Sequence, residues 1–222
     1  MIELIKTMFS YDFMVQAVVV GLLVTLCASL LGVSMVLKRY SMIGDGLSHV
    51  SFGALSIAIA LGFAPIKFSI PIVIIAAFFL LRLAENGKMK SDAAIAMVSA
   101  SSLAIGVIVT SLTTGLSTDV CSYMFGSILA MSKDDVIFSV VLSVVVLIMF
   151  GFCYHRIFAV TFDESFSKAT GVKVGMYNTL ISIFTAVTVV LGIKMMGAML
   201  ISSLIIFPAL TSMRVFKSFL SV

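Results

Sequence analysis

The chain has 222 residues, of which 61% are hydrophobic and 11% charged, and its formal net charge is +4. This apolar share, with a mean hydropathy of +1.25, excludes an ordinary soluble domain and indicates a polytopic membrane protein. The net charge is too small to indicate nucleic-acid binding, and membrane topology explains it better.

Seven apolar segments are long enough to cross a bilayer. They are predicted at residues 13–37, 42–62, 66–82, 92–113, 135–154, 177–195 and 197–213. Between the fourth and fifth, in "GLSTDVCSYMFGSILAMSKDD", the apolar part at roughly residues 120–131 is too short to cross and fits a re-entrant half-helix. The predicted fold class is therefore all-α, a polytopic transmembrane helical bundle of about seven spans plus this half-helix, in one domain over residues 1–222.

Basic residues predict the orientation, because cytoplasmic loops keep an excess of Lys and Arg. In the seven-span scheme four basic residues fall on one side and ten on the other. The ten are Lys38, Arg39, Arg82, Lys88, Lys90, Arg156, Lys168, Lys173, Arg214 and Lys217. This bias predicts an external N-terminus, an internal C-terminal end, and an external position for the half-helix.

The second predicted span, "MIGDGLSHVSFGALSIAIALG", begins with an aspartate and a histidine four residues apart. On a helix, Asp45 and His49 share a stripe of polar and small residues, and ionisable groups in a span are costly unless they face the bundle interior. A carboxylate and an imidazole on one face can approach one ion together and suit Zn, Mn or Fe(II). The alternative from the residues alone is a structural hydrogen-bonded pair, with Asp45 also favoured by the helix dipole.

The longest internal connection, residues 155–178, alternates apolar and charged side chains and predicts a short amphipathic helix. Such a helix either lies on the inner leaflet or docks on a cytoplasmic partner, and the pattern alone does not choose. Gly171, just past this helix, suits a left-handed C-terminal cap.

Four stretches occur together in order: "RYSMIGDGLSHVSFGALSIAIALG", "YMFGSILAMSKDD", "FDESFSKATGVKVGMYNTLISIFTAVTVV" and "GAMLISSLIIFPALTS". This combination resembles the membrane subunit of the zinc/manganese/iron-chelate ABC importers, over most of residues 35–215. The resemblance implies a multi-pass permease of the bacterial cell membrane that imports divalent transition metal ions. The expected cargo is zinc or manganese, and Asp and His ligands are also compatible with iron. The resemblance implies no enzyme activity of the chain's own, and the chain has no GxxxxGK[ST] nucleotide motif.

The resemblance also implies roles for particular residues. The family's GD-x-LSH motif falls on Gly44, Asp45 and residues 47–49, which makes Asp45 and His49 the expected metal-coordinating pair. The Y-x-FGSIL motif makes Tyr123, Phe125 and Gly126 part of an expected outer gate. Its neighbour Asp119 is expected to help attract cations, although a solvated loop acid or helix cap is the alternative.

Coupling residues follow from a third motif. The family's FDE-x6-G segment falls on Phe162, Asp163, Glu164 and Gly171, and would form the coupling helix seated on the ATPase. Implied partners are a cytoplasmic ATP-binding subunit that holds the ATP, an extracytoplasmic metal-binding protein, a second permease copy in a homodimer, and membrane lipids. No permanently bound cofactor is expected, because the metal ion is the cargo.

The sequence departs from the family in two places. Many relatives have Pro-Gly shortly after the motif histidine, whereas this chain has Phe52 and Gly53, which gives less reason to expect a helix break. Relatives also usually continue for one or two further spans, so the chain is expected to be a truncated copy or to have its last packing layer supplied differently.

Two other functions are compatible with an Asp–His pair in a membrane span. A secondary transporter driven by protons or sodium also uses Asp and His, but such proteins usually contain inverted repeats, which are not evident here. An intramembrane metallohydrolase would need further ligands, yet the chain has no HExxH motif and His155 is its only other histidine.

Overall fold

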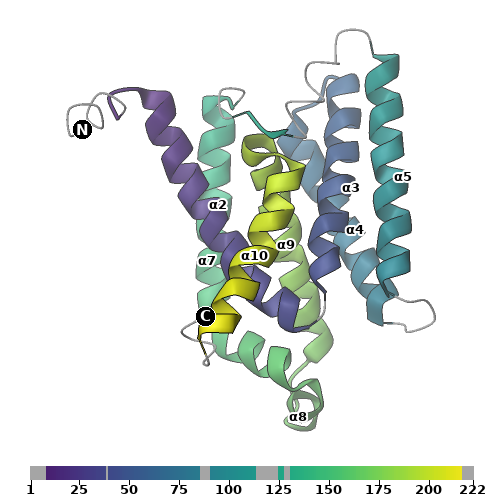
Figure 1. Ribbon diagram of the computed structural model, residues 1–222, viewed down its shortest axis with the longest axis vertical. Coiled ribbons are helices and arrows are strands. Elements are labelled where there is room, and N and C mark those ends of the chain that lie inside the picture. The colour runs from purple at the N-terminus through teal and green to yellow at the C-terminus, as the bar shows by residue number, and fades with distance from the viewer. Residues whose placement is uncertain (1–8, 39, 86–90, 114–124, 128–130, 217–222) are drawn as a thin grey trace.

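A computed structural model describes residues 9–38, 40–85, 91–113, 125–127 and 131–216 (Figure 1). Regular structure within these ranges is helical. The helices are α2 (Asp12–Leu37), α3 (Ser41–Ala60), α4 (Pro65–Glu85), α5 (Ser91–Leu112), α7 (Lys133–Phe162), α8 (Glu164–Ala169), α9 (Val174–Met196) and α10 (Ala198–Val215).

Seven of these helices, all except α8, are long and apolar enough to cross a membrane. The all-α fold class with seven spans is confirmed, and each of these seven helices matches one predicted span, whereas most of the predicted half-helix at residues 120–131 lies outside the described residues. The fifth span is longer than predicted, because α7 runs from Lys133 to Phe162 rather than ending near residue 154. At 1.5 Å per residue its 30 residues span about 45 Å, more than the roughly 30 Å hydrocarbon core, so one end of α7 extends past the core.

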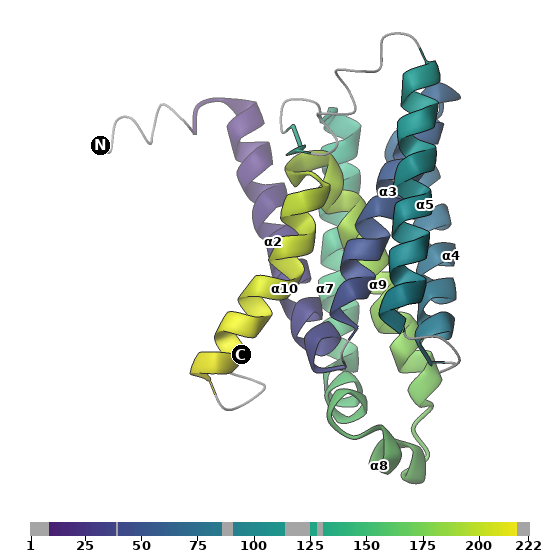
Figure 2. The ribbon, with the colours of Figure 1, turned by 45° about the vertical axis from the view of Figure 1, so that its right-hand side comes forward.

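The two most buried spans, α3 and α9, form the centre of the bundle. The helix α3 contacts α4, α5, α9 and α10, while α9 also contacts α2, α4, α7 and α10. The spans α5 and α7 are among the least buried, and Figures 1 and 2 show α8 beyond one end of the bundle. That end is called the α8 end below, and the other is called the opposite end.

Small residues allow α3 and α5 to approach closely. A Cβ added at Gly53 would lie 2.8 Å from the carbonyl oxygen of Ser102, and one added at Gly106 would lie 2.6 Å from a ring carbon of Phe52. Such contacts are typical of membrane helices, where close packing replaces the hydrophobic drive found in water. The result is a tightly held α3 that continues without a break through Phe52 and Gly53.

Candidate functional site

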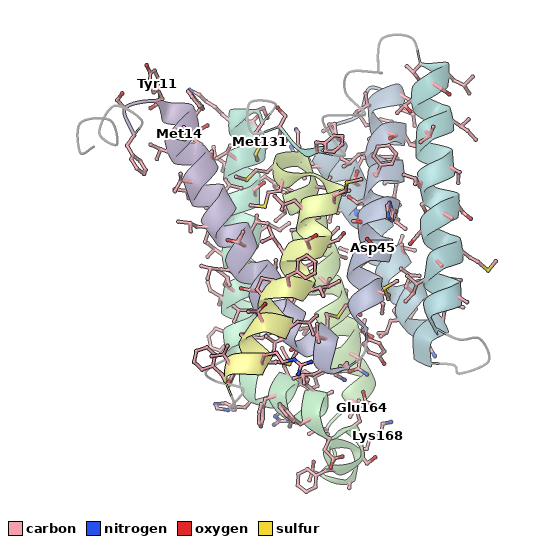
Figure 3. All side chains as sticks on the ribbon, in the orientation of Figure 1. Tyr11, Met14, Asp45, Met131, Glu164 and Lys168 are labelled. Atoms are coloured by element: carbon pink, nitrogen blue, oxygen red, sulfur yellow. The ribbon has the colours of Figure 1, made fainter. Side chains whose placement is uncertain are left out.

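The helix α3 places Asp45 and His49 in its first half, on the same side. The helix begins at Ser41, so His49 lies about 12 Å along it from the α8 end. Figure 3 shows Asp45 on α3 within the bundle, apart from Glu164 and Lys168 at the α8 end. The i, i+4 pair predicted from the sequence is therefore present in the fold.

The separation of the pair favours a ligand site over a structural hydrogen bond. His49 Nε2 lies 3.7 Å from Asp45 Oδ2, which is longer than a hydrogen bond. The side chains of His49 and Asp45 are 29% and 42% exposed, so neither is enclosed as a core group would be. Two donors at this distance can both reach one ion, since metal–ligand bonds of about 2.1 Å sum to roughly 4.2 Å.

Neighbouring helices define where the pair points. Gly46 packs against α5 near Ile95, while Ser48 accepts a 3.1 Å hydrogen bond from Ser202 of α10. At 100° per residue, Asp45 and His49 lie on the arc of α3 between these two contacts. The Asp45 and His49 side chains are therefore partly exposed in the space between α5 and α10.

The pair supplies two ligands and no more. Among the residues that the structure describes, no three His, Cys, Asp or Glu side chains are grouped so that they could hold a metal ion. The other histidine, His155 on α7, instead packs edge-on against Tyr154 at 5.6 Å between ring centroids. A catalytic zinc site takes three protein ligands, so the described residues do not support the metallohydrolase alternative.

The predicted outer gate is described in part. Phe125, Gly126 and Ser127 lie at the opposite end, where the Ser127 amide donates to the Lys194 carbonyl at 3.4 Å. Gly126 has φ of +78° and lies directly against the backbone at Met196 and Gly197, so both its conformation and its contacts require glycine. Asp119 and Tyr123 lie outside the described residues.

Next to this segment, an ion pair joins α9 and α7. Lys194, in the last turn of α9, binds Asp135 Oδ2 in the first turn of α7, and their side chains are only 9% and 20% exposed. Asp135 also forms a capping box with Ser132, whose hydroxyl accepts from the Asp135 amide at 3.2 Å. The predicted gate segment therefore contacts the end of α9, which the Lys194–Asp135 ion pair joins to α7.

At the α8 end, the predicted amphipathic helix is broken in two. Phe158 and Phe162 belong to α7, which ends at Phe162, and only Glu164–Ala169 form α8. The break occurs because Asp163 is extended and its carboxylate accepts from the Phe166 amide at 2.8 Å, capping the new helix. The predicted short amphipathic helix is therefore limited to Glu164–Ala169, because Phe158 and Phe162 belong to α7 and Asp163 caps a new helix.

Gly171 ends α8 as predicted. Its φ is +80°, and its amide donates to the Lys168 carbonyl at 3.1 Å while the Val172 amide donates to the Ser167 carbonyl at 2.9 Å. These two bonds form a Schellman motif, which requires the left-handed conformation that glycine adopts without strain. Gly171 therefore shapes the end of α8 through its backbone.

A polar cluster, here called the α8 anchor, consists of Lys38, Glu164 and Asn178. Lys38, directly after α2, donates to Glu164 Oε1 at 2.8 Å and also to the Asn178 side-chain oxygen. The Asn178 amide donates to the same Glu164 oxygen at 3.2 Å. Lys38 is 4% exposed and Glu164 40%, so the anchor ties α8 to α2 and α9 at the edge of the bundle.

The anchor favours the charged form of Glu164. Burial raises the pKa of its carboxyl, but hydrogen bonds from Lys38 and Asn178, with the nearby charges of Lys38 and Lys168, outweigh this and lower the pKa below its ordinary value. Glu164 is therefore ionised at neutral pH and keeps its contacts with Lys38 and Asn178.

Sequence patterns did not indicate the partners of the two paired carboxylates, Glu164 and Asp135. Lys38 directly follows the predicted span 13–37, while Asn178 and Lys194 lie near the two ends of the predicted span 177–195, and none of these positions indicates a partner. The one available signal was a polar amide at the start of an apolar helix, because such groups need hydrogen-bond partners. In the structure Asn178 is buried.

The fold and site together define a polytopic helical membrane protein of the transport class. The family model of the ABC 3 transport family matches residues 10–222, and the chain belongs to that family. This confirms the resemblance in the motifs.

Three similar proteins extend the comparison. The manganese import system permease protein ScaB of Streptococcus gordonii is 27% identical over 97% of this chain and 77% of its own length. The high-affinity zinc uptake system membrane protein ZnuB of Haemophilus influenzae is 26% identical over 92% and 78%. The solved structure of PsaBC from Streptococcus pneumoniae in complex with Fab matches with a TM-score of 0.86 and 27% identity, covering all of this chain and 80% of that one.

Proposed function

We propose that this chain is the membrane-spanning permease subunit of an ATP-driven importer for divalent transition metal ions, zinc or manganese. The cation passes the Asp45–His49 pair as cargo. Family membership and the manganese and zinc systems named for ScaB and ZnuB support the substrate class. ATP is hydrolysed by a separate cytoplasmic subunit, and an extracytoplasmic protein delivers the metal.

The observation that carries the proposal is the open Asp45–His49 pair. Its 3.7 Å separation suits two donors on one ion, and its exposure on the arc of α3 between α5 and α10 gives the ion access. A buried pair held by a hydrogen bond would instead be satisfied without cargo. In a low-dielectric passage, a cation that sheds water needs such replacement ligands.

A second permease copy completes the site. Within the part of the chain that the structure describes, one copy offers two ligands, whereas zinc is usually held by four and manganese by more. If the same α3 face of a second copy meets this one about a twofold axis, two pairs supply four ligands to one passage. The homodimer therefore follows from the number of ligands each chain supplies.

The ATP-binding subunit docks on α8. This helix projects beyond the spans in Figures 1 and 2, and its Phe166 is 64% exposed. Lys38 pairs with Glu164 of α8, and Arg82 lies in the last turn of α4. The exposed Phe166 ring suits a groove in a partner subunit. The α8 anchor links α8 to α2 and α9, so a movement of the partner at α8 is transmitted to these spans. The positive charges at this end support a cytoplasmic location. The cation-attracting role of Asp119 and the single domain over residues 1–222 stay predictions.

Metal uptake by single variants of the assembled complex tests this function. Asp45→Asn removes the charge at nearly constant size and His49→Ala removes the nitrogen ligand, so each lowers uptake per assembled complex at least tenfold, about 1.4 kcal/mol of lost cation binding or more. The matched controls are Asp134→Asn and His155→Ala, which change the same residue types away from α3. Near-normal uptake in both site variants, or equal losses in the controls, would contradict the proposal.

A further inference from the structure

A pocket of about 610 Å³ lies between α4 and α9 at the α8 end, on a different part of the molecule from the Asp45–His49 pair. Its lining includes Phe78, Leu81 and Arg82 of α4 and Gly175, Thr179 and Phe184 of α9. Leu81 and Phe184 are buried, whereas Phe78 and Arg82 are exposed at the rim. A volume of this size falls in the range of small-molecule and lipid sites.

The wall of this pocket is suited to hydrocarbon. The hydroxyl of Thr179 donates to the Gly175 carbonyl within α9 at 2.8 Å, so its donor is satisfied without a ligand in the pocket. The remaining lining side chains apart from Arg82 are apolar. An occupant of the interior therefore gains by burying apolar surface, not by polar recognition.

The length of the pocket corresponds to one leaflet. It follows α9 from Gly175 to Phe184, which is about 14 Å at 1.5 Å per residue. Half of a roughly 30 Å hydrocarbon core has nearly this thickness. Because α9 begins at Val174, the pocket starts at the end of the helix and reaches about the middle of the bilayer.

Arg82 places a positive charge at the mouth. Its guanidinium carbon lies 5.6 Å from the centre of the Phe78 ring, a cation–π contact that uses the face of the group and leaves its N–H donors available. No carboxylate of the described side chains forms an ion pair with Arg82. The pocket thus combines a leaflet-deep apolar groove with an anion-binding group at the headgroup level.

We propose that this pocket binds an anionic phospholipid, with one acyl chain between α4 and α9 and the phosphate on Arg82. Basic pockets between membrane helices at the cytoplasmic side are suited to such headgroups. In the orientation proposed above this is the cytoplasmic leaflet, and the lipid lies beside the first turns of α9 that also carry Asn178 of the α8 anchor.

Lipid retention by the 222-residue chain tests the site. The protein is equilibrated in mixed vesicles of phosphatidylglycerol and phosphatidylcholine with identical acyl chains, and the lipids that stay bound after extraction are measured by mass spectrometry. We expect a preference for phosphatidylglycerol of about fivefold, the factor given by about 1 kcal/mol of attraction per basic residue. Arg82→Gln reduces this preference to parity, and the matched control Arg156→Gln, an exposed arginine on α7, preserves it.

A second variant tests the groove. A Cβ at Gly175 meets nothing within 4 Å, so this position in the pocket lining admits a side chain, and Gly175→Leu is expected to occupy part of the pocket and lower retention of both lipids. Gly151→Leu, an equally open glycine on α7, is the control and leaves retention unchanged. Equal retention of the two lipids by the wild type would overturn the proposal. So would an effect of Gly175→Leu on oligomeric state alone, because a second copy would then be the occupant.

Discussion

Each end of the bundle has a lysine and a carboxylate that join different helices, and the two pairs have the same electrostatic design. Lys38 follows the last turn of α2 and Lys194 lies in the last turn of α9, while Glu164 and Asp135 lie in the first turns of α8 and α7. In both pairs the lysine lies at the negative C-terminal end of a helix dipole and the carboxylate at the positive N-terminal end of another, and both placements are favourable.

The surroundings of the two pairs differ. Lys194 and Asp135 connect two long spans and are both largely buried, so the loss of one partner leaves a charge within packed helices. Glu164 is much more exposed and has Asn178 and Lys168 beside Lys38, and it holds a helix of only six residues. A lysine–carboxylate pair thus stabilises the fold at one end of the bundle, and a second such pair positions the short, protruding α8 at the other.

The largest effect expected from this comparison is on stability, at the opposite end. Asp135→Asn leaves the Lys194 ammonium without its carboxylate, and breaking a largely buried pair costs on the order of 3 kcal/mol. The midpoint of chemical unfolding in detergent measures the loss. Asp134→Asn is the control, since this exposed neighbour in the same turn is outside the pair.

A double variant sharpens this prediction. Lys194→Met in the Asp135→Asn background removes the uncompensated charge and should recover most of the lost stability. If the double variant is no more stable than Asp135→Asn alone, the capping box with Ser132 rather than the ion pair explains the effect.

A smaller effect on stability, but a selective one on function, is expected at the α8 end. Lys38→Met frees Glu164 from α2, so ATP hydrolysis by the assembled complex continues while metal uptake per ATP falls several-fold. Global stability falls by less than about 1 kcal/mol, since Glu164 is partly exposed and keeps Asn178. Uptake and ATP hydrolysis measured on the same vesicles give the ratio.

Lys168→Met is the matched control for Lys38→Met. Lys168 also faces Glu164, at 4.0 Å from Oε2, but it is exposed on α8 itself and joins no other helix. Equal uncoupling in both variants would mean that charge near Glu164 matters and the link to α2 does not. A stability loss in Lys38→Met as large as in Asp135→Asn would remove the distinction between the two ends.

The sequence predicted the features that depend on local periodicity. The seven spans follow from length and hydropathy, and the Asp45–His49 pair from helical spacing, because both are properties of a continuous stretch. Lys38 and Glu164 are 126 residues apart and Lys38 and Asn178 are 140 apart, so their meeting depends on how helices pack. The exposure of Asp45 and His49 depends on packing too, and helical spacing alone left the structural alternative open.

The smallest effect is the pH dependence of the α8 anchor. Because the pKa of Glu164 is lowered in the folded protein, the stabilisation that it gives is fully present above the ordinary glutamate value of about 4.3. It is lost only as the pH falls further, through the folded pKa. A spin label at the exposed Phe166 position reports the mobility of α8, which should stay constant from pH 7 to about 4.5 and rise below it. In Glu164→Gln the label should be mobile at every pH, since a neutral amide pairs weakly with Lys38. A label that loosens in the wild type well above pH 4.5 would show that another group, not Glu164, holds α8 against α2 and α9.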